Sequence, residues 1–374
     1  MKKIGVITFH SAENSGAVLQ CWALQTALKK LGAAPFVIDY QPDYARKQYQ
    51  VLLNPFVEAG QRGVKGWRYV RSVLAFTIQD ILFYRKLSRQ FRFKRFRRKN
   101  LDISPCYDSY RQLAESPPEA DVYLAGSDQI WNPFLTGGDY DPAFFLRFGS
   151  APKYTYAVSV GKEPDETDVR QIQTLAKDIS TISLREQEAC ERLAPALGPE
   201  RVARHLDPTL LLTGEDWMPM VRPPHVPQPY ILVYALERNP LFSRALEKLR
   251  QDSSMQLVDI SQCNLKLPRT SCRMLDFAPD EFLSMVANAN LVLTNSFHCT
   301  VFSAIFHKPF LVVPHTRSNS RISGLLAALG LEDCLLDETS DFRLPRPDWT
   351  SVEEKIARLR VPSLEYLRQI VEKG

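Results

Sequence analysis

Residues 3–40 read KIGVITFHSAENSGAVLQCWALQTALKKLGAAPFVIDY, and this stretch decides the fold class. KIGVITF (3–9) is a short apolar run of high β-propensity, typical of a buried parallel strand. The polar turn HSAENSG leads to AVLQCWALQTALKKLG, whose apolar residues recur at helical spacing until Gly32, the expected helix C-cap. PFVIDY (35–40) reads as a second strand. The stretch therefore predicts a strand–helix–strand unit that opens an α/β sheet.

The same alternation of strands and helices continues in two blocks. The first block resumes at ADVYLAG (120–126) and extends to residue 222. PPHVPQP (223–229), with four prolines in seven residues, is the expected linker. The alternation restarts at YILVYAL (230–236) and continues to residue 349, and a helical tail (350–374) is expected to pack back on the first domain. The sequence thus predicts an α/β protein with two doubly wound Rossmann-like domains, residues 1–222 and 230–349.

Residues 42–118 interrupt the first block, and we predict a helical insertion there because they are rich in Arg, Lys and aromatic residues without a clear strand. Within it, RKLSRQFRFKRFRRK (85–99) carries nine basic residues and three phenylalanines. This run could contact an anionic membrane surface, hold a phosphate-bearing acceptor, or simply form a solvated helix face. It carries no nucleic-acid recognition motif, so we expect no nucleic-acid partner.

The composition sets limits on the class of protein. The chain has 374 residues, 45% hydrophobic and 24% charged, which suits a soluble two-domain protein. Its net charge of +5 hints at anionic partners, and no apolar run is long enough to span a membrane. The seven cysteines are irregularly spaced with no C-x-x-C, so we expect neither a disulfide framework nor a zinc site, and a reducing cytoplasm fits.

The loops after the strands are the places to seek chemistry, because ligands of open α/β sheets bind at the carboxyl ends of the strands. The first such loop has no G-x-G-x-x-G and no G-x-x-x-x-G-K-[ST], so a nucleotide fingerprint is absent. Asn14, Ser15 and Gly16 nevertheless stand at a helix N-terminus, whose free N–H groups suit anions or hydroxyl-rich ligands. The alternative is a plain N-cap and tight turn.

A second loop, AGSDQIWN (125–132), gathers Gly126, Ser127, Asp128, Gln129 and Trp131 after a strand. Carboxylate, amide and indole together suit a sugar, whose hydroxyls want paired donors and acceptors beside a flat apolar face. A capping aspartate and a core tryptophan would give the same sequence.

Arg185 follows the strand TISL at the start of a helix. A guanidinium at this position can hold a phosphate or carboxylate through two parallel hydrogen bonds. The alternative is a salt bridge with Glu186 or Glu188.

TNSFHCTVFSAIFHKPF (294–310) places Asn295, Ser296 and His298 at the end of the strand NLVLTN, with Ser296 as the N-cap of an apolar, buried helix. The helix N-terminus carries partial positive charge, and a histidine there can move a proton near neutral pH. His298 is therefore the candidate acid–base. Lys308 and Arg321 are candidate cations that could donate hydrogen bonds to a ligand. The alternative is that they are ordinary surface residues.

In combination, these motifs resemble the polysaccharide pyruvyl transferase family. The resemblance rests on IGVITFHSAENSGAVLQCWALQTALKKLG, AGSDQIWN, YAVSVGK, ISLREQEA, LDPTLLLTGEDW and TNSFHCTVFSAIFHKPF, and above all on GSDQIWN with NSFH. It covers most of the chain outside the insertion and the tail.

The resemblance implies a fold like that of GT-B glycosyltransferases. It implies transfer of a pyruvyl group from phosphoenolpyruvate to two hydroxyls of a sugar, which forms a ketal and releases phosphate without a metal or redox cofactor. The donor's phosphate and carboxylate suit Arg185, a helix N-terminus and a second cation, and His298 is the candidate acid. The acceptor would be a lipid-linked or nucleotide-linked sugar of a cell-surface polysaccharide, at the cytoplasmic face of the membrane.

The chain departs from the family pattern at two positions, and the first of them concerns the second cation. Some branches of the family carry Arg-x-His where this chain has Ser296, so Lys308 or Arg321 is expected to replace that arginine. The residue after the histidine is often Gly and here is Cys299.

The alternatives to a pyruvyl transferase are a GT-B glycosyltransferase that uses a nucleotide sugar, and a non-catalytic protein of exopolysaccharide assembly.

Overall fold

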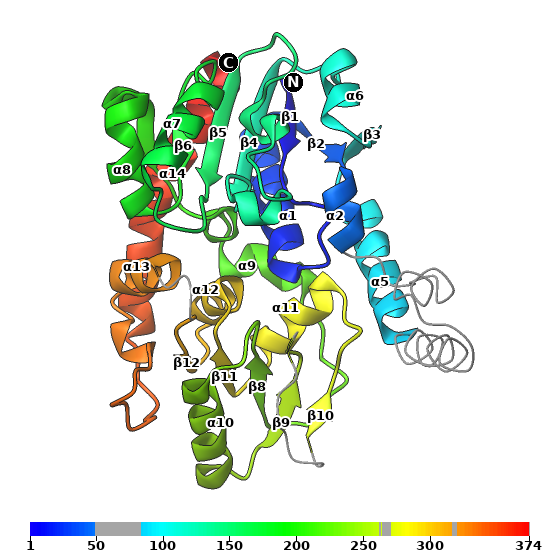
Figure 1. Ribbon diagram of the computed structural model, residues 1–374. Helices are drawn as coiled ribbons and strands as arrows, with labels where there is room; N and C mark the ends of the chain where they lie inside the picture. The colour runs from blue at the N-terminus through cyan, green and yellow to red at the C-terminus, as the bar shows by residue number, and fades with distance from the viewer. Residues whose placement is uncertain (49–83, 262, 264–270, 316–319, 374) are drawn as a thin grey trace, which may run out of the picture.

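The structure is a computed structural model that describes residues 1–48, 84–261, 263, 271–315 and 320–373. Two parallel β-sheets lie one above the other in Figure 1, with helices between them and on their outer faces. Residues 49–83, which belong to the predicted insertion, lie outside the described residues.

The first sheet has seven parallel strands in the order β3-β2-β1-β4-β5-β6-β7. Its centre is the stretch quoted above: β1 pairs with β2 on one side and with β4 on the other. Four of the five β1 residues are buried, which explains its nearly continuous apolar sequence. The strands are β1 (Lys3–Ile7), β2 (Ala34–Tyr40), β3 (Ile103–Tyr107), β4 (Val122–Asp128), β5 (Lys153–Val158), β6 (Ile182–Leu184) and β7 (Val202–Arg204).

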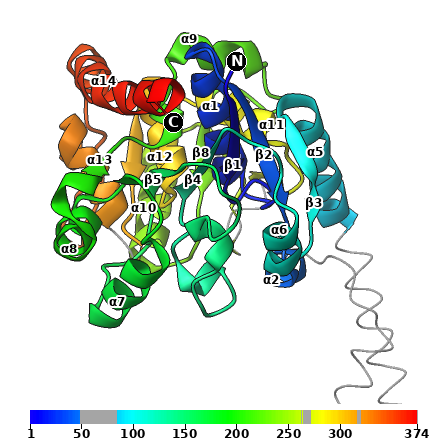
Figure 2. The same ribbon diagram turned by 90° about the horizontal axis from the view of Figure 1, so that it is seen from above.

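Helices cover both faces of this sheet, with α1 and α14 on one face and α6 and α7 on the other (Figure 2). Asn14 caps α1, because its Oδ1 accepts hydrogen bonds from the N–H groups of Gly16 and Ala17. The chain leaves α1 through Gly32, whose φ of 87° is the left-handed conformation that glycine adopts readily. The helices of this half are α1 (Ser15–Lys30), α2 (Asp43–Gln48), α5 (Tyr84–Asn100), α6 (Tyr110–Glu115), α7 (Glu166–Leu175), α8 (Gln187–Leu197) and α9 (Gly214–Trp217).

The prediction of a purely helical insertion over residues 42–118 is wrong at one place. Ile103–Tyr107 forms β3, the edge strand beside β2. Its sequence, ISPCY, contains a proline and little apolar periodicity, which is tolerated because an edge strand pairs on one side only. The basic helix α5 is also more than a solvated element, since Phe93 and Phe96 are buried in the core.

The second sheet has five parallel strands in the order β10-β9-β8-β11-β12. One of its faces packs against α11 and α12, and the other packs against α10. The strands are β8 (Tyr230–Tyr234), β9 (Gln256–Asp259), β10 (Cys272–Arg273), β11 (Leu291–Thr294) and β12 (Phe310–Val312). The helices are α10 (Pro240–Asp252), α11 (Pro279–Ala287), α12 (Phe297–Ile305), α13 (Ser320–Leu329) and α14 (Trp349–Lys373).

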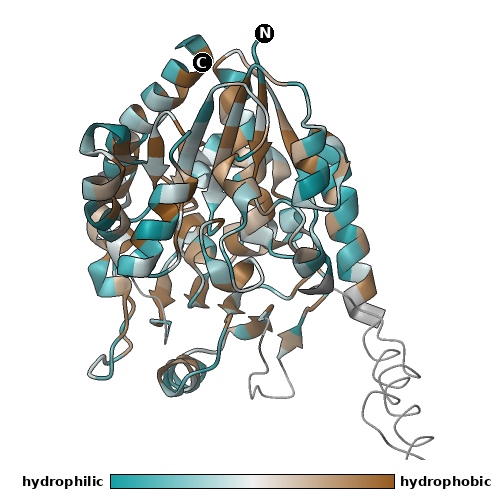
Figure 3. Cartoon of the chain, turned by 45° about the horizontal axis from the view of Figure 1, so that its top comes forward, coloured by the Kyte–Doolittle hydropathy of each residue, from teal (hydrophilic) through white to brown (hydrophobic). Residues whose placement is uncertain are grey.

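One apolar cluster joins the two halves. It contains Val18 of α1, Phe96 of α5 and Trp217 of α9 together with Phe282 of α11 and Phe302 of α12. The rings of Trp217 and Phe302 meet edge to face with centroids 4.9 Å apart. The hydrophobic segments accordingly lie inside the molecule, between the sheets as well as within each layer (Figure 3).

The last helix, α14, runs along both halves (Figure 1). Val352 and Ile356 near its start join the shared cluster, whereas Leu367 and Ile370 near its end pack against the first sheet. No helix in the described ranges is both long enough and apolar enough to cross a membrane. All seven cysteines are free thiols.

Candidate active site

The carboxyl ends of strands from both sheets meet at one cluster of buried charged side chains. Arg185, just after β6, lies at its centre with a side chain that is only 4% exposed. Its Nη1 is 2.5 Å from Asp207 Oδ2, its Nη2 is 3.6 Å from Asp128 Oδ1, and its Nε is 3.9 Å from Glu186 Oε1. Burial lowers the pKa of this guanidinium, but the three carboxylates outweigh burial and raise it, so Arg185 stays charged.

Asp207 connects Arg185 to the second domain. It follows β7, and its Oδ1 accepts hydrogen bonds from the N–H (3.0 Å) and the hydroxyl (2.6 Å) of Thr209. Its Oδ2 contacts Arg185 and lies 3.5 Å from Nε2 of His298. Burial raises the pKa of the Asp207 carboxyl, but His298 and Arg185 reverse this effect and hold the pKa well below its ordinary value. The carboxylate is therefore fixed and charged between the two candidate residues.

His298 lies where the N-terminus of α12 meets the N-terminus of α1. It is the second residue of α12, is 8% exposed, and faces Gly16 at the start of α1. A Cβ on Gly16 would lie 2.8 Å from His298 Cβ and still closer to the imidazole ring. Only glycine at position 16 leaves room for the ring, which explains one residue of the predicted turn.

A second arginine completes the cluster. Arg321, in the first turn of α13, lines the same pocket as Arg185, Glu186, His205, Asp207 and Phe297. The Cζ atoms of Arg185 and Arg321 lie 4.9 Å and 6.0 Å from the centroid of the Phe297 ring. Burial lowers the pKa of Arg321, and the nearby charge of Arg185 acts in the same direction. An anion placed between the two guanidinium groups would relieve their repulsion.

Several buried polar atoms of this cluster have no hydrogen-bond partner among the described residues. They are Nε and Nη2 of Arg185, Nε of Arg321, Nε2 of His298 and Oε2 of Glu186. Ser296, the N-cap residue of α12, makes no side-chain capping hydrogen bond. Buried polar groups are normally paired, so such a concentration of unpaired N–H groups indicates a binding site for an anion.

The predicted residues divide into those that the structure brings together and those that it holds elsewhere. Gly16, Asp128, Arg185, Ser296, His298 and Arg321 belong to or border the cluster. Asn14 and Ser15 stand beside it, but the Asn14 side chain is occupied as the α1 cap and the buried Ser15 hydroxyl has no partner among the described residues.

Three predicted ligand contacts are structural in this conformation, which corrects their assignment. The Asn295 amide is used at both ends, since Oδ1 accepts from Leu236 N–H at 2.7 Å and Nδ2 donates to Glu237 C=O at 2.9 Å. The Ser127 hydroxyl donates to Ala157 C=O. Gly126, with a φ of 126°, lies too close to the backbone of Tyr156 for any side chain.

Trp131 and Lys308 were predicted to bind ligands, and their positions contradict this. Trp131 is fully buried, stacks on Phe145 at 4.6 Å and donates its indole N–H to Phe144 C=O, so it offers no face to a sugar. Gln129, beside it, stays half-buried, and its Oε1 accepts a hydrogen bond from Asn132.

Lys308 lies beyond the far end of α12, which as a nine-residue helix places it roughly 13 Å along the axis from His298. Of the two predicted cations, Arg321 lies in the pocket of Arg185, and Lys308 is not among the residues that line it.

Sequence reasoning missed Asp207 and Glu186 as members of the cluster. Asp207 belongs to the quoted segment LDPTLLLTGEDW and lies three residues after the end of β7, so the strand-end rule could have selected it. Glu186 was considered only as a salt-bridge partner of Arg185, although it also accepts a hydrogen bond from the buried Ser159 hydroxyl. In the part of the chain that the structure describes, no three His, Cys, Asp or Glu side chains are arranged to hold a metal ion.

The fold and the cluster define a two-domain Rossmann-like protein of GT-B architecture with a charged site where the domains meet. A sequence model of the family "Polysaccharide pyruvyl transferase" matches residues 14–317. The chain therefore belongs to the polysaccharide pyruvyl transferase family and is a transferase. A search of curated proteins finds no match.

Solved structures with a similar fold include UDP-N-acetylglucosamine 2-epimerases. The enzyme from Rickettsia bellii is 13% identical, with 99% of each chain covered and a TM-score of 0.45. The enzyme from Neisseria meningitidis, bound to UDP-GlcNAc, is 11% identical, with 100% of this chain and 94% of that chain covered and a TM-score of 0.45. At such identities the likeness concerns the fold alone.

Proposed function

We propose that the protein transfers a pyruvyl group from phosphoenolpyruvate to two hydroxyls of a sugar, with formation of a ketal and release of phosphate. The observation that carries this proposal is a set of buried nitrogen atoms of Arg185, Arg321 and His298 that have no hydrogen-bond partner among the described residues. Arg185 and Arg321 line one pocket together with Asp207, and His298 adjoins that pocket through Asp207. A small donor with a phosphate and a carboxylate matches two guanidinium groups and an acid–base.

The donor would bind between the domains. Asp207 already holds Nη1 of Arg185. Nε and Nη2, on the other edge of the guanidinium, make no hydrogen bond with a described residue, since Glu186 and Asp128 lie 3.9 Å and 3.6 Å away, and this edge can receive two oxygens of one anionic group. Arg321 supplies the second cation. The free N–H groups at the start of α12 and the Ser296 hydroxyl add neutral donors.

His298 would supply the proton that makes the donor electrophilic. Protonation of C3 turns the enol carbon C2 into an oxocarbenium centre, which the first sugar hydroxyl attacks. The C2–O bond to phosphate then breaks, the second hydroxyl attacks C2, and the ketal closes. One of the two hydroxyl protons restores the proton that His298 gave to C3, and the other leaves with phosphate. Asp207, 3.5 Å from Nε2, faces the imidazolium whenever it forms and holds the ring in place.

The acceptor would approach from the first domain, along the loop that carries Asp128 and Gln129. Asp128 is 8% exposed and contacts Arg185 at 3.6 Å, so a hydroxyl beside it would also lie close to the donor. Because the family acts on polysaccharides, the proposed acceptor is a lipid-linked or nucleotide-linked precursor of a cell-surface polysaccharide. No cofactor enters the scheme, since phosphoenolpyruvate is a co-substrate.

The test is release of phosphate from phosphoenolpyruvate by the purified protein with candidate acceptors, with His298→Ala and Arg185→Lys as variants. We expect both variants to lose most of the activity while they retain the fold by circular dichroism. If both variants release phosphate as fast as the wild type, the site is wrongly assigned. If a nucleoside diphosphate raises the melting temperature and phosphoenolpyruvate does not, a glycosyltransferase function replaces this proposal.

We further propose that the outer face of α5 contacts the anionic inner surface of the cell membrane. Phe91 and Leu87, one turn apart on this face, are 70% and 36% exposed, and the basic residues Lys94 and Arg98 continue the face. The affinity for vesicles that contain phosphatidylglycerol, measured by co-sedimentation, should fall roughly thirtyfold in Phe91→Ala, since a buried phenylalanine contributes about 2 kcal/mol. Equal sedimentation of wild type and variant would contradict this contact.

A further inference from the structure

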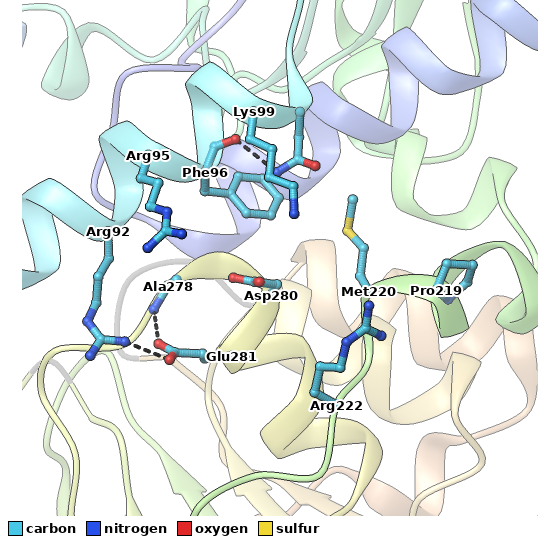
Figure 4. Close-up of a pocket in the computed structure, with 11 residues that line it drawn as sticks. Arg92, Arg95, Phe96, Lys99, Pro219, Met220, Arg222, Ala278, Asp280 and Glu281 are labelled. Carbon is cyan, nitrogen blue, oxygen red and sulfur yellow. Dashed lines mark hydrogen bonds and ion pairs between the residues drawn. The ribbon is translucent and has the colours of Figure 1, made fainter.

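A second hollow lies between α5 and α11, away from the pocket that Arg185 and Arg321 line. It is a groove of about 390 Å³, and none of its lining residues lines the first pocket. Three segments form it: α5 above, the chain that crosses between the two sheets, and the start of α11 below (Figure 4). Its lining residues are Arg92, Arg95, Phe96, Lys99, Asn100, Pro219, Met220, Arg222, Ala278, Asp280 and Glu281.

Basic side chains outnumber acidic ones in this groove. The carboxylate of Glu281 already has two partners: it pairs with Arg92 at 2.6 Å and accepts a hydrogen bond from Ala278 N–H at 2.7 Å. Arg95 and Lys99 make no ion pair within the described ranges, and there the Arg222 side chain donates only to the carbonyl of its neighbour Val221. Three cations therefore face a single remaining carboxylate, that of Asp280.

These cations are aimed at one space. In Figure 4 the side chains of Arg95 and Lys99 descend from α5 while that of Arg222 rises from below, and the gap lies between them. Arg95 and Lys99 are four residues apart, so they lie about 6 Å from each other on one side of the helix. Phe96 and Met220 give the groove an apolar wall.

The helix that carries two of the cations is held firmly. Phe93 and Phe96 anchor its inner face in the shared core. Arg97 donates to Ser11 C=O at 3.1 Å and Arg89 donates to Glu13 C=O at 3.0 Å, in the loop that leads to α1. A ligand in the groove would meet cations that are already positioned, so little ordering would oppose binding.

We propose that this groove binds the phosphate or diphosphate group of a small organic phosphate. Guanidinium and ammonium groups form charge-assisted hydrogen bonds with phosphate oxygens, and three of them converge here with no ion-pair partner among the described residues. Because the ligand would contact α5 of the first domain, Arg222 of the crossing chain and α11 of the second domain, its binding would restrain the two domains relative to each other. The proposal is independent of pyruvyl transfer, since the two pockets share no residue.

The chain offers a matched control for the test. Arg95 and Lys99 line the groove, whereas Lys94 and Arg98, the same two residue types at the same spacing, lie on the outer face of the same helix. Arg95→Ala/Lys99→Ala and Lys94→Ala/Arg98→Ala therefore remove equal charge from α5. Arg222→Ala tests the groove from the opposite side.

Isothermal titration with inorganic pyrophosphate compares the wild type with these three variants. The residues that line the pocket of Arg185 and Arg321 are unchanged in all four proteins, so differences among them report on the groove. We expect binding to weaken at least about tenfold in Arg95→Ala/Lys99→Ala and in Arg222→Ala, and to stay within about twofold in Lys94→Ala/Arg98→Ala. Unchanged binding in the two groove variants would overturn the proposal, and so would an equal loss in the outer-face control.

Competition then identifies the source of the phosphate. Vesicles with an anionic phospholipid that displace pyrophosphate equally from the wild type and from Phe91→Ala would place the phosphate group on a lipid. Displacement only by soluble organic phosphates would place it on a soluble metabolite. Both results support the groove as the site, whereas displacement that persists unchanged in Arg95→Ala/Lys99→Ala would overturn it.

Discussion

The main prediction concerns the contact between Gly16 and His298. One methyl group added at position 16 should lower the rate of the reaction strongly and change the stability of the fold only slightly. In Gly16→Ala the new carbon would lie 2.8 Å from His298 Cβ and closer still to the ring. Carbon and nitrogen atoms pack at about 3.5–4.0 Å, so the imidazole must move by more than about 1 Å or α1 must retreat by the same distance. Either movement changes the distance of 3.5 Å between Nε2 and Asp207.

A displacement of about 1 Å at a reacting group can cost on the order of 100-fold in rate, or about 2.7 kcal/mol in transition-state free energy. The fold should suffer less, since alanine is a better helix residue than glycine by roughly 0.5–1 kcal/mol, and this offsets part of the crowding. We therefore expect a loss of about 100-fold in kcat/KM for phosphate release and a change of only a few degrees in Tm.

Gly214→Ala is the matched control. Gly214 is also in the first turn of a helix, α9, but a Cβ there would meet only Ile305 C=O at 3.5 Å, which is an ordinary contact. This variant should keep the activity of the wild type. If Gly16→Ala is as active as Gly214→Ala and equally stable, the position of His298 against α1 does not matter for the reaction and the reasoning is refuted.

Three further substitutions test the cluster and its surroundings. Asp207→Asn should lower kcat at least about 100-fold and the free energy of unfolding by about 3 kcal/mol, measured by steady-state kinetics and urea unfolding. Since the pKa of Asp207 is held below its ordinary value, its stabilising charge is complete above the unfolded pKa and is lost as pH falls through the folded pKa, so the wild type alone should show this acid-side loss. Arg321→Ala should raise the KM for phosphoenolpyruvate roughly tenfold or more while Lys308→Ala leaves it within about twofold, and the reverse order would exclude Arg321 as the second cation. Trp131→Phe should lower the free energy of unfolding by about 2 kcal/mol without a change in the acceptor KM, and a raised acceptor KM would restore Trp131 as a sugar contact.

Much of the site could be found from the sequence because ligands of parallel sheets bind at the carboxyl ends of the strands, and these ends can be recognised in the sequence. This rule selected the segments that supply Gly16, Asp128, Arg185 and His298, which converge in the structure. Asp207 was missed although it also follows a strand, and Glu186 was considered only as a salt-bridge partner of Arg185. The contact of Asp207 with His298 joins residues 91 positions apart, and local sequence contains no sign of it.

The errors have a common physical origin. An aromatic ring after a strand can serve a core or a ligand with the same sequence, and in Trp131 packing on Phe145 decides for the core. Lys308 is close to His298 along the chain, yet the rise of α12 separates them, whereas Arg321 comes back from another helix. The edge strand β3 escaped notice because a strand with one neighbour needs neither an apolar run nor the absence of proline.

The most direct test of the proposed reaction follows the proton. The protein is incubated in deuterium oxide with phosphoenolpyruvate and a sugar acceptor, and the product is measured by mass spectrometry and NMR. Proton transfer to C3 predicts a ketal whose methyl group carries one deuterium, with one phosphate released for each ketal, and it predicts that His298→Ala forms neither. Phosphate release without a ketal, or a methyl group without deuterium, would contradict the account.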